Sequence, residues 1–142
     1  RTEEDRAAVE EAVLDGTIDC IITDHAPHSA EEKADFEKAP NGVVGLETSL
    51  AATLTKLYYS GKCGLDKIAE IMSVNPRKIM GLEPIKIAVG ERCDLCIFDP
   101  DYEWEVIPAE LNSKSKNSVF KGTRLKGKVM YTICRGKLVF EL

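Results

Sequence analysis

The chain has 142 residues, of which 44% are hydrophobic and 30% charged, a composition typical of a soluble globular protein. Its net charge of −5 argues against nucleic acid as the main partner, because phosphate binding requires a basic face. No apolar run approaches the roughly 20 residues that cross a membrane, and no signal peptide is visible. The 5 cysteines lack the spacing of a secreted disulfide framework, which favours a reducing, cytoplasmic location.

The first predicted element is a helix that begins after Thr2 and ends at Asp15-Gly16. Thr2 is a good N-cap, and three acidic residues follow it in the first turn. Gly16 is a typical helix stop. Because the chain starts with Arg1 instead of Met and is helical in character from its beginning, we expect it to be a piece of a longer protein.

A buried strand is predicted over residues 18–23, which are short, apolar and rich in β-branched side chains. Asp24 follows this strand, and the only two histidines, His25 and His28, come directly after it. In an α/β barrel the loops that follow the strands carry the catalytic groups. We therefore expect the functional site at residues 24–28.

Asp24 could bind a metal ion, act as a general base, or do both. His28 could be a metal ligand or a donor to a substrate carboxylate. The alternative is that Asp24 caps the loop and that both histidines are ordinary exposed loop residues.

Residues 24–45 form a long loop, and loops of this length in a compact domain are usually functional. The loop contains a turn at Pro40-Asn41-Gly42, and Gly45 leads into the next helix. A glycine-containing loop before a helix can offer backbone N–H groups to an anion or to a ring carbonyl. An ordinary turn followed by a helix is the simpler interpretation.

The remaining pattern predicts helices that serve as scaffold, followed by a small β-unit. The helices are expected at residues 46–60 and 65–72 and from Asn75-Pro76 to Gly81. The strands are expected at residues 85–89, 94–98, 102–106, 128–134 and 137–140, with a hairpin turn at Arg135-Gly136.

Cys93 and Cys96 form a C-x-x-C motif that could be half of a zinc site or a redox pair. No second pair of this kind exists, and the motif runs into a strand where a thioredoxin-like motif would open a helix. We therefore interpret both as buried, core-type cysteines.

Several motifs together resemble the C-terminal third of the dihydroorotase family of cyclic amidohydrolases. The most specific are Asp-Cys-Ile-Ile-Thr-Asp-His-Ala-Pro-His at 19–28, Glu-Glu-Lys at 31–33 and Ala-Pro-x-Gly-x-x-Gly-Leu-Glu-Thr at 39–48. Further similar stretches lie at 75–82, 90–100 and 116–129, so the resemblance covers nearly the whole chain.

The resemblance implies an α/β fold, namely the C-terminal part of a (β/α)8 TIM-type barrel plus part of a small β-sandwich. Residues 1–82 would be the last part of the barrel, and residues 83–142 would be the C-terminal share of the sandwich. A complete barrel takes around 250 residues, so this chain alone cannot close one.

The resemblance also implies a reaction, the reversible cyclisation of N-carbamoyl-L-aspartate to L-dihydroorotate in pyrimidine biosynthesis. Asp24 matches the family's metal-binding aspartate, which moves a proton between the attacking water and the ring nitrogen. His28 matches the residue that holds the substrate carboxylate. Asn41 and Gly42 match the loop that contacts the substrate ring, whereas His25 matches no residue with a direct role.

The cofactor implied is zinc, as one or two ions whose other ligands lie outside this chain. One ligand cannot hold a zinc ion that needs about four donors, so the chain alone should be inactive. The implied partner is a small-molecule substrate, and a homodimer or an association with aspartate transcarbamoylase would also fit the family.

Two alternatives to an active dihydroorotase stay open. One is another cyclic amidohydrolase of the dihydropyrimidinase or allantoinase type. The other is a non-catalytic dihydroorotase-like partner of aspartate transcarbamoylase, although such a protein would be free to lose Asp24 and His28.

Overall fold

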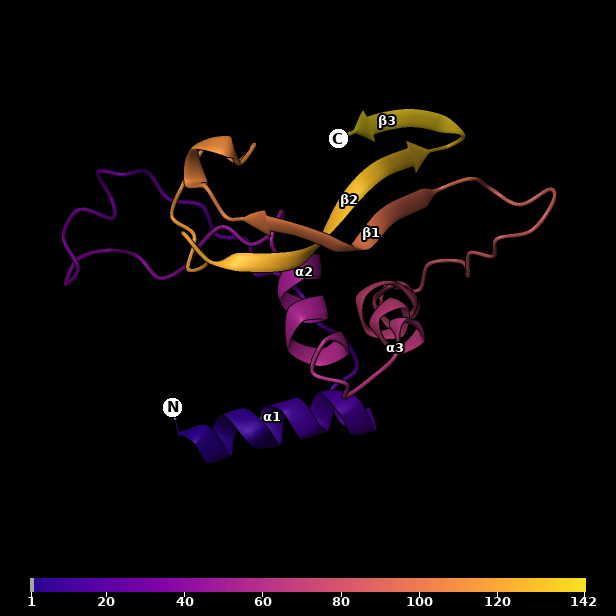
Figure 1. The fold of residues 1–142 in the computed structure, drawn as a ribbon, viewed down its shortest axis with the longest axis horizontal. Coiled ribbons are helices and arrows are strands. Elements are labelled where there is room, and N and C mark those ends of the chain that lie inside the picture. The colour runs from indigo at the N-terminus through magenta and orange to yellow at the C-terminus, as the bar shows by residue number, and fades with distance from the viewer. Residues whose placement is uncertain (1) are drawn as a thin grey trace. The chain divides into compact units, whose positions relative to one another are not determined.

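The computed structural model describes residues 2–142 as an α/β chain with one three-stranded sheet, shown in Figure 1. The α-helices are α1 (Glu3–Asp15), α2 (Ser49–Thr53), α3 (Leu65–Ala69) and α4 (Asn75–Ile79). Two π-helical segments cover Leu54–Tyr58 and Glu70–Val74, and a 3-10 turn covers Pro108–Glu110. The strands are β1 (Leu95–Glu105), β2 (Arg124–Cys134) and β3 (Lys137–Glu141).

The chain forms two compact units. The first unit contains residues up to 21, residues 56–97 and residues 130–142, and the second contains residues 22–55 and 98–129. The division into domains predicted at residue 82 stays a prediction. Within residues 2–142, no helix has the length and apolar character needed to cross a bilayer.

Helix α1 confirms the predicted bounds and caps. The Thr2 hydroxyl accepts a hydrogen bond from the Asp5 N–H at 3.1 Å, and the Asp5 carboxylate accepts one from the Thr2 N–H at 3.0 Å. This reciprocal pair satisfies backbone donors that the first turn of a helix leaves unpaired. Gly16 ends the helix with φ of 87°, a left-handed conformation that glycine adopts without strain.

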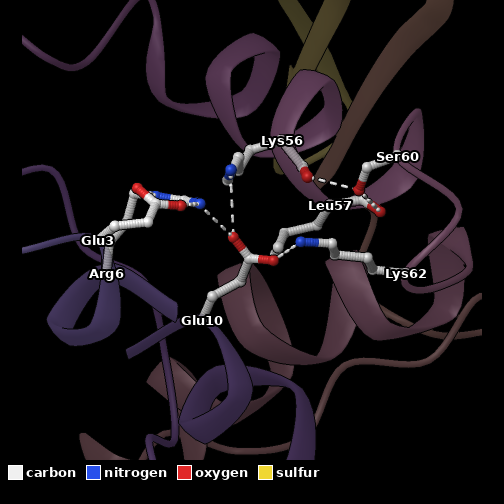
Figure 2. Close-up of polar contacts among 7 residues, drawn as sticks. All are labelled: Glu3, Arg6, Glu10, Lys56, Leu57, Ser60 and Lys62. Carbon is white, nitrogen blue, oxygen red and sulfur yellow. Dashed lines mark hydrogen bonds and ion pairs between the residues drawn. The ribbon is translucent and has the colours of Figure 1, made fainter. Parts of the chain in front are cut away.

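One carboxylate in the first unit binds three cationic side chains, as Figure 2 shows. Glu10 of α1 lies 3.0 Å from Arg6 and 3.2 Å from Lys56, and it also contacts Lys62. The Glu10 side chain is only 11% exposed, whereas the three cationic side chains are 38% to 53% exposed, so solvent still screens these ion pairs in part. They attach α1 to the π-helical segment and to the turn that follows it.

The predicted strand over residues 18–23 is wrong within this chain. The segment has no regular secondary structure, and its backbone hydrogen bonds are isolated ones, such as that from the Ile21 N–H to the Ile71 carbonyl at 3.1 Å. A strand exists only where a neighbouring strand completes its hydrogen bonds, and residues 2–142 place no such neighbour here.

The predicted helices are confirmed with shifted bounds. The helix predicted from residue 46 begins at Ser49, because residues 45–48 form a turn in which the Gly45 carbonyl accepts bonds from Thr48 and Ser49. The helices predicted at 65–72 and from Asn75 join without a break through a π-helical segment. Pro76 is the second residue of α4 and follows the π-helical segment directly.

The sheet has the order β1-β2-β3, and β2 pairs with β3 in antiparallel fashion. The hairpin turn is confirmed, since Arg135 and Gly136 have φ of 50° and 75°, the conformation that a tight two-residue turn requires. One strand prediction is wrong, because residues 85–89 form no strand. The strands predicted at 94–98 and 102–106 are confirmed with shifted bounds, but they join into the single strand β1. Pro100 does not interrupt β1, because an edge strand tolerates proline.

The second unit has a compact apolar core. Ala51 of α2, Leu125 of β2 and Val106 are buried together, and Trp104 and Phe120 pack against them. This core fixes the end of β1 and the start of β2 beside the helix that follows the loop of residues 24–45.

Cys93 and Cys96 are exposed, so their interpretation as core cysteines is wrong for this chain. Cys93 lies in the loop before β1, and Cys96 lies on β1, the edge strand of the sheet. Nothing in the described residues packs over them closely enough to bury them.

Candidate active site

Asp24 adopts a backbone conformation that is unusual for a residue other than glycine. Its φ is 42°, in the left-handed region, where aspartate and asparagine are the most tolerated of the non-glycine residues. Strained positions of this kind are concentrated at functional sites. The conformation turns the chain sharply at the end of the extended segment and begins the loop of residues 24–45.

The two ends of this loop lie side by side. His25 and Val43 form an isolated parallel bridge, and the Ala26 N–H donates to the Val43 carbonyl at 3.0 Å. Further along, Nε2 of His28 lies 3.1 Å from the carbonyl oxygen of Asn41 and donates to it. The structure therefore brings together His28 and the Asn41-Gly42 turn, which are separated by thirteen positions in the chain.

Gly42 has no room for a side chain. A Cβ atom there would lie 2.5 Å from Cβ of Ala26 and 3.0 Å from its carbonyl oxygen, and φ is 121°. Gly45 is also confined, because its Cβ would lie 3.0 Å from the carbonyl oxygen of Thr23. Both glycines thus allow the second half of the loop to lie against the residues that flank Asp24.

His25 has a structural role that the sequence did not reveal. Its Nδ1 accepts a hydrogen bond from the Gly45 N–H at 3.0 Å and lies 3.4 Å from the Leu46 nitrogen. Because Nδ1 accepts, the proton of the neutral ring lies on Nε2. His25 therefore supports the turn that precedes α2.

His28 is held on several sides. Its carbonyl oxygen accepts a hydrogen bond from the Ser115 hydroxyl at 2.6 Å, and Nδ1 lies 3.6 Å from the carboxylate of Glu32. The backbone N–H of Ser29 lowers the pKa of the Glu32 carboxyl, burial offsets part of this, and the nearby His28 lowers the pKa further. The His28 side chain stays 23% exposed, so it is accessible from solvent.

A cleft of about 670 Å³ opens beside His28. It is lined by residues 27–30, Lys33 and residues 114–117, which include two further lysines. The surface of the cleft is therefore positively charged, as expected for a site that receives an anion.

The segment that follows β1 also supports the site. The Glu47 carboxylate accepts hydrogen bonds from the Asn112 N–H at 2.9 Å, the Asn112 side chain at 3.0 Å and the Ser113 N–H at 3.0 Å. Burial raises the pKa of Glu47, but these bonds and the charge of Lys128 outweigh it, so the pKa lies below its usual value. Sequence reasoning assigned no role to Glu47, although it belongs to the motif at 39–48.

The described residues do not complete a metal site. Within residues 2–142, no three side chains of His, Cys, Asp or Glu gather where they could hold a metal ion. Asp24 is a carboxylate of the kind that binds zinc, but it stands without further ligands from this part of the chain.

Comparisons with known proteins agree with these features. The sequence model of the amidohydrolase family matches residues 1–139. The dihydroorotase of Geobacter sp. (strain M21) is 46% identical over 142 residues, and that of Clostridioides difficile (strain 630) is 47% identical over 142 residues. Each alignment covers 99% of this chain and 33% of the relative, so the chain spans about a third of the length of these curated relatives.

Among solved structures, an L-hydantoinase (dihydropyrimidinase) from Arthrobacter aurescens matches with a TM-score of 0.89 and 35% identity. That alignment covers 99% of this chain and 33% of the other. The fold of residues 2–142 is therefore similar to that of the corresponding third of this L-hydantoinase chain.

Proposed function

Because the chain belongs to the amidohydrolase family, we propose that the protein that carries it is a dihydroorotase. The reaction would be the interconversion of N-carbamoyl-L-aspartate and L-dihydroorotate in pyrimidine biosynthesis. The relatives named dihydroorotase, at 46% and 47% identity, support this choice of substrate. The observation that carries it is the position of His28, which lines the lysine-bearing cleft and donates to the carbonyl of Asn41 in the Asn41-Gly42 turn.

Each site residue has a proposed role. Asp24 carries the proton between the attacking water and the ring nitrogen, and it is also a metal ligand. His28 donates to the substrate carboxylate. Asn41 and Gly42 contact the ring through their backbone, and the close approach of Ala26 keeps Gly42 without a side chain.

We propose that the cofactor is zinc, bound as one or two ions with further ligands from residues outside this chain. Zinc, when bound, supplies an acidified water at neutral pH. The residues of this chain contribute the rest: Asp24 holds and moves the proton, and His28 and the turn orient the substrate. By themselves they do not form a complete catalytic site.

We also propose how the chain is divided between two domains. Residues 1–82 would be the last part of a (β/α)8 barrel, and residues 83–142 would be the C-terminal share of a small β-sandwich. The barrel would supply the neighbouring strand that residues 18–23 lack within this chain.

A second candidate is a hydrolase of the dihydropyrimidinase type, because the L-hydantoinase structure is 35% identical to this chain. The basic cleft beside His28 favours a substrate with a carboxylate, which dihydroorotate has and dihydrouracil lacks. A cytoplasmic location, a homodimer, and an association with aspartate transcarbamoylase in which the chain is not catalytic stay predictions.

The experiment that tests the proposal is a zinc-dependent ring-opening assay of the whole protein, followed by ultraviolet absorbance. L-dihydroorotate is compared with dihydrouracil. Turnover of dihydroorotate that is lost on chelation supports the proposal, whereas turnover of dihydrouracil alone moves the function to the second candidate. Absence of turnover with either substrate, with zinc supplied and the fold intact, favours the non-catalytic partner.

A further inference from the structure

Lys33 is the half-buried residue in an otherwise exposed stretch, residues 31–38 of the loop. Its ammonium group donates a hydrogen bond to the Gly42 carbonyl at 2.8 Å and another to the Pro40 carbonyl. These two carbonyls belong to the residues on either side of Asn41. Lys38, in the same stretch, has a side chain that is 85% exposed and pairs with nearby Asp35 at 2.8 Å.

The Gly42 carbonyl is held from a second direction. The side-chain amide of Asn117 donates to it at 3.0 Å, and the Val44 N–H donates to the Asn117 carbonyl at 3.2 Å. A carbonyl oxygen has two lone pairs, so Lys33 and Asn117 together satisfy Gly42. The peptide units around Asn41 are thereby fixed, and the Asn41 carbonyl itself lies against His28.

These contacts determine what the ammonium of Lys33 can do. Two of its three donors are directed at backbone carbonyls, so it is not free to bind an anionic substrate in the way an unengaged lysine of the cleft could. Its charge is used to hold the loop instead. A charged donor is also stronger than a neutral one, and a neutral side chain would hold the carbonyls less firmly.

We propose that Lys33 is a positioning residue for substrate binding: its ammonium holds the Pro40 and Gly42 carbonyls so that the turn presents Asn41 and Gly42 to the substrate ring. This inference rests on the proposed function for its substrate, but the loop-holding contacts stand independently of it. Lys33 itself touches no reacting atom in this scheme.

The test compares Lys33→Met with Lys38→Met in the whole protein, with L-dihydroorotate as the substrate. Lys33→Met keeps the length of the side chain and removes its donors. We expect KM to rise about tenfold with kcat reduced less than about threefold, because ground-state binding is what the turn provides. Lys38→Met should leave both constants unchanged, and Lys33→Arg should restore most of the loss in KM.

A second measurement separates the failure of this inference from the failure of the proposed function. Amide hydrogen exchange of Ala26 and Val44, whose N–H groups bond within the loop and to Asn117, should accelerate about tenfold in Lys33→Met but not in Lys38→Met. If the unmodified protein does not act on dihydroorotate, the proposed function fails and the substrate part of this inference falls with it. Unchanged exchange, or a KM equal to that of Lys38→Met, overturns the positioning role.

Discussion

Nδ1 of His25 accepts a hydrogen bond from the backbone N–H of Gly45 at 3.0 Å, across twenty positions of the chain. The imidazole that directly follows Asp24 is therefore committed to the backbone. Of the two histidines in the motif, His28 is the one that lines the cleft. His25 supports the turn before α2, whereas His28 holds the Asn41 carbonyl and lines the cleft.

Replacing His25 by alanine should destabilise the protein, because it leaves the Gly45 N–H without its acceptor. The expected loss is about 1–2 kcal/mol in the free energy of unfolding, measured by urea denaturation. His25→Asn, which retains a side-chain acceptor, should recover part of it. Glu11→Ala, at an exposed position of α1, is the control, and a loss no larger than that of this control would contradict the assignment.

Gly42→Ala should disrupt the site more than an alanine at another glycine of positive φ. Both Gly42 and Gly16 adopt left-handed φ values, so alanine is strained at either position, by about 1–2 kcal/mol. Only at Gly42 does the new Cβ meet other atoms, those of Ala26, and overpacking adds about 1–3 kcal/mol. Thermal unfolding of the two variants gives the comparison, and equal shifts would refute the close approach.

Asp24→Asn should abolish most of the turnover while leaving the fold intact. Asparagine tolerates the left-handed backbone as well as aspartate does, so the change removes the proton-carrying carboxylate without adding strain. We expect kcat to fall by about 10² to 10⁴, the range for loss of a general acid–base group. Circular dichroism checks the fold, and near-normal turnover of a folded variant would exclude the role.

The Glu47 contact should make the segment at Asn112 and Ser113 sensitive to acid. The folded state lowers the pKa of this carboxyl below its ordinary value of 4.5, so the unfolded state takes up a proton first as the pH falls. The stabilisation is therefore complete above pH 4.5 and is lost as the pH drops through the lower, folded pKa.

Amide protection factors of Asn112 and Ser113 between pH 7 and 3 measure this effect, with Glu47→Gln as the comparison. Glu47→Gln should have lower protection factors than the unmodified protein at neutral pH. On acidification its protection factors should change little further, by no more than about the effect of an ordinary surface substitution. Glu11→Gln, at an exposed position of α1, is the control. A wild-type profile that is flat over this range would contradict the prediction.

The local features of the fold were the most predictable from sequence. The capped helix α1 and the turn at Arg135-Gly136 depend on residues that are close in the chain, so their signals are complete within a few positions. The same holds for Gly42 and Gly45, which the motif at 39–48 singles out and which the structure shows to be confined.

Features that depend on distant neighbours could not be predicted in this way. The segment at 18–23 has the composition of a strand, yet its state depends on whether another strand lies beside it. The same limit explains the single strand β1, since Pro100 is compatible with an edge strand only, and edge position is a property of the whole sheet. Likewise, the partner of His25 lies twenty positions away.

Because of the ion pairs of Glu10, the protein should tolerate mutation of the paired cations better than mutation of Glu10 itself. One carboxylate neutralises three cations, Arg6, Lys56 and Lys62. Removal of any one cation leaves the anion still paired, whereas removal of the anion takes this counter-charge from Lys56 and Lys62 together, while Arg6 keeps its ion pair with Glu3. Substitutions should therefore be accepted more readily at the three basic positions than at Glu10.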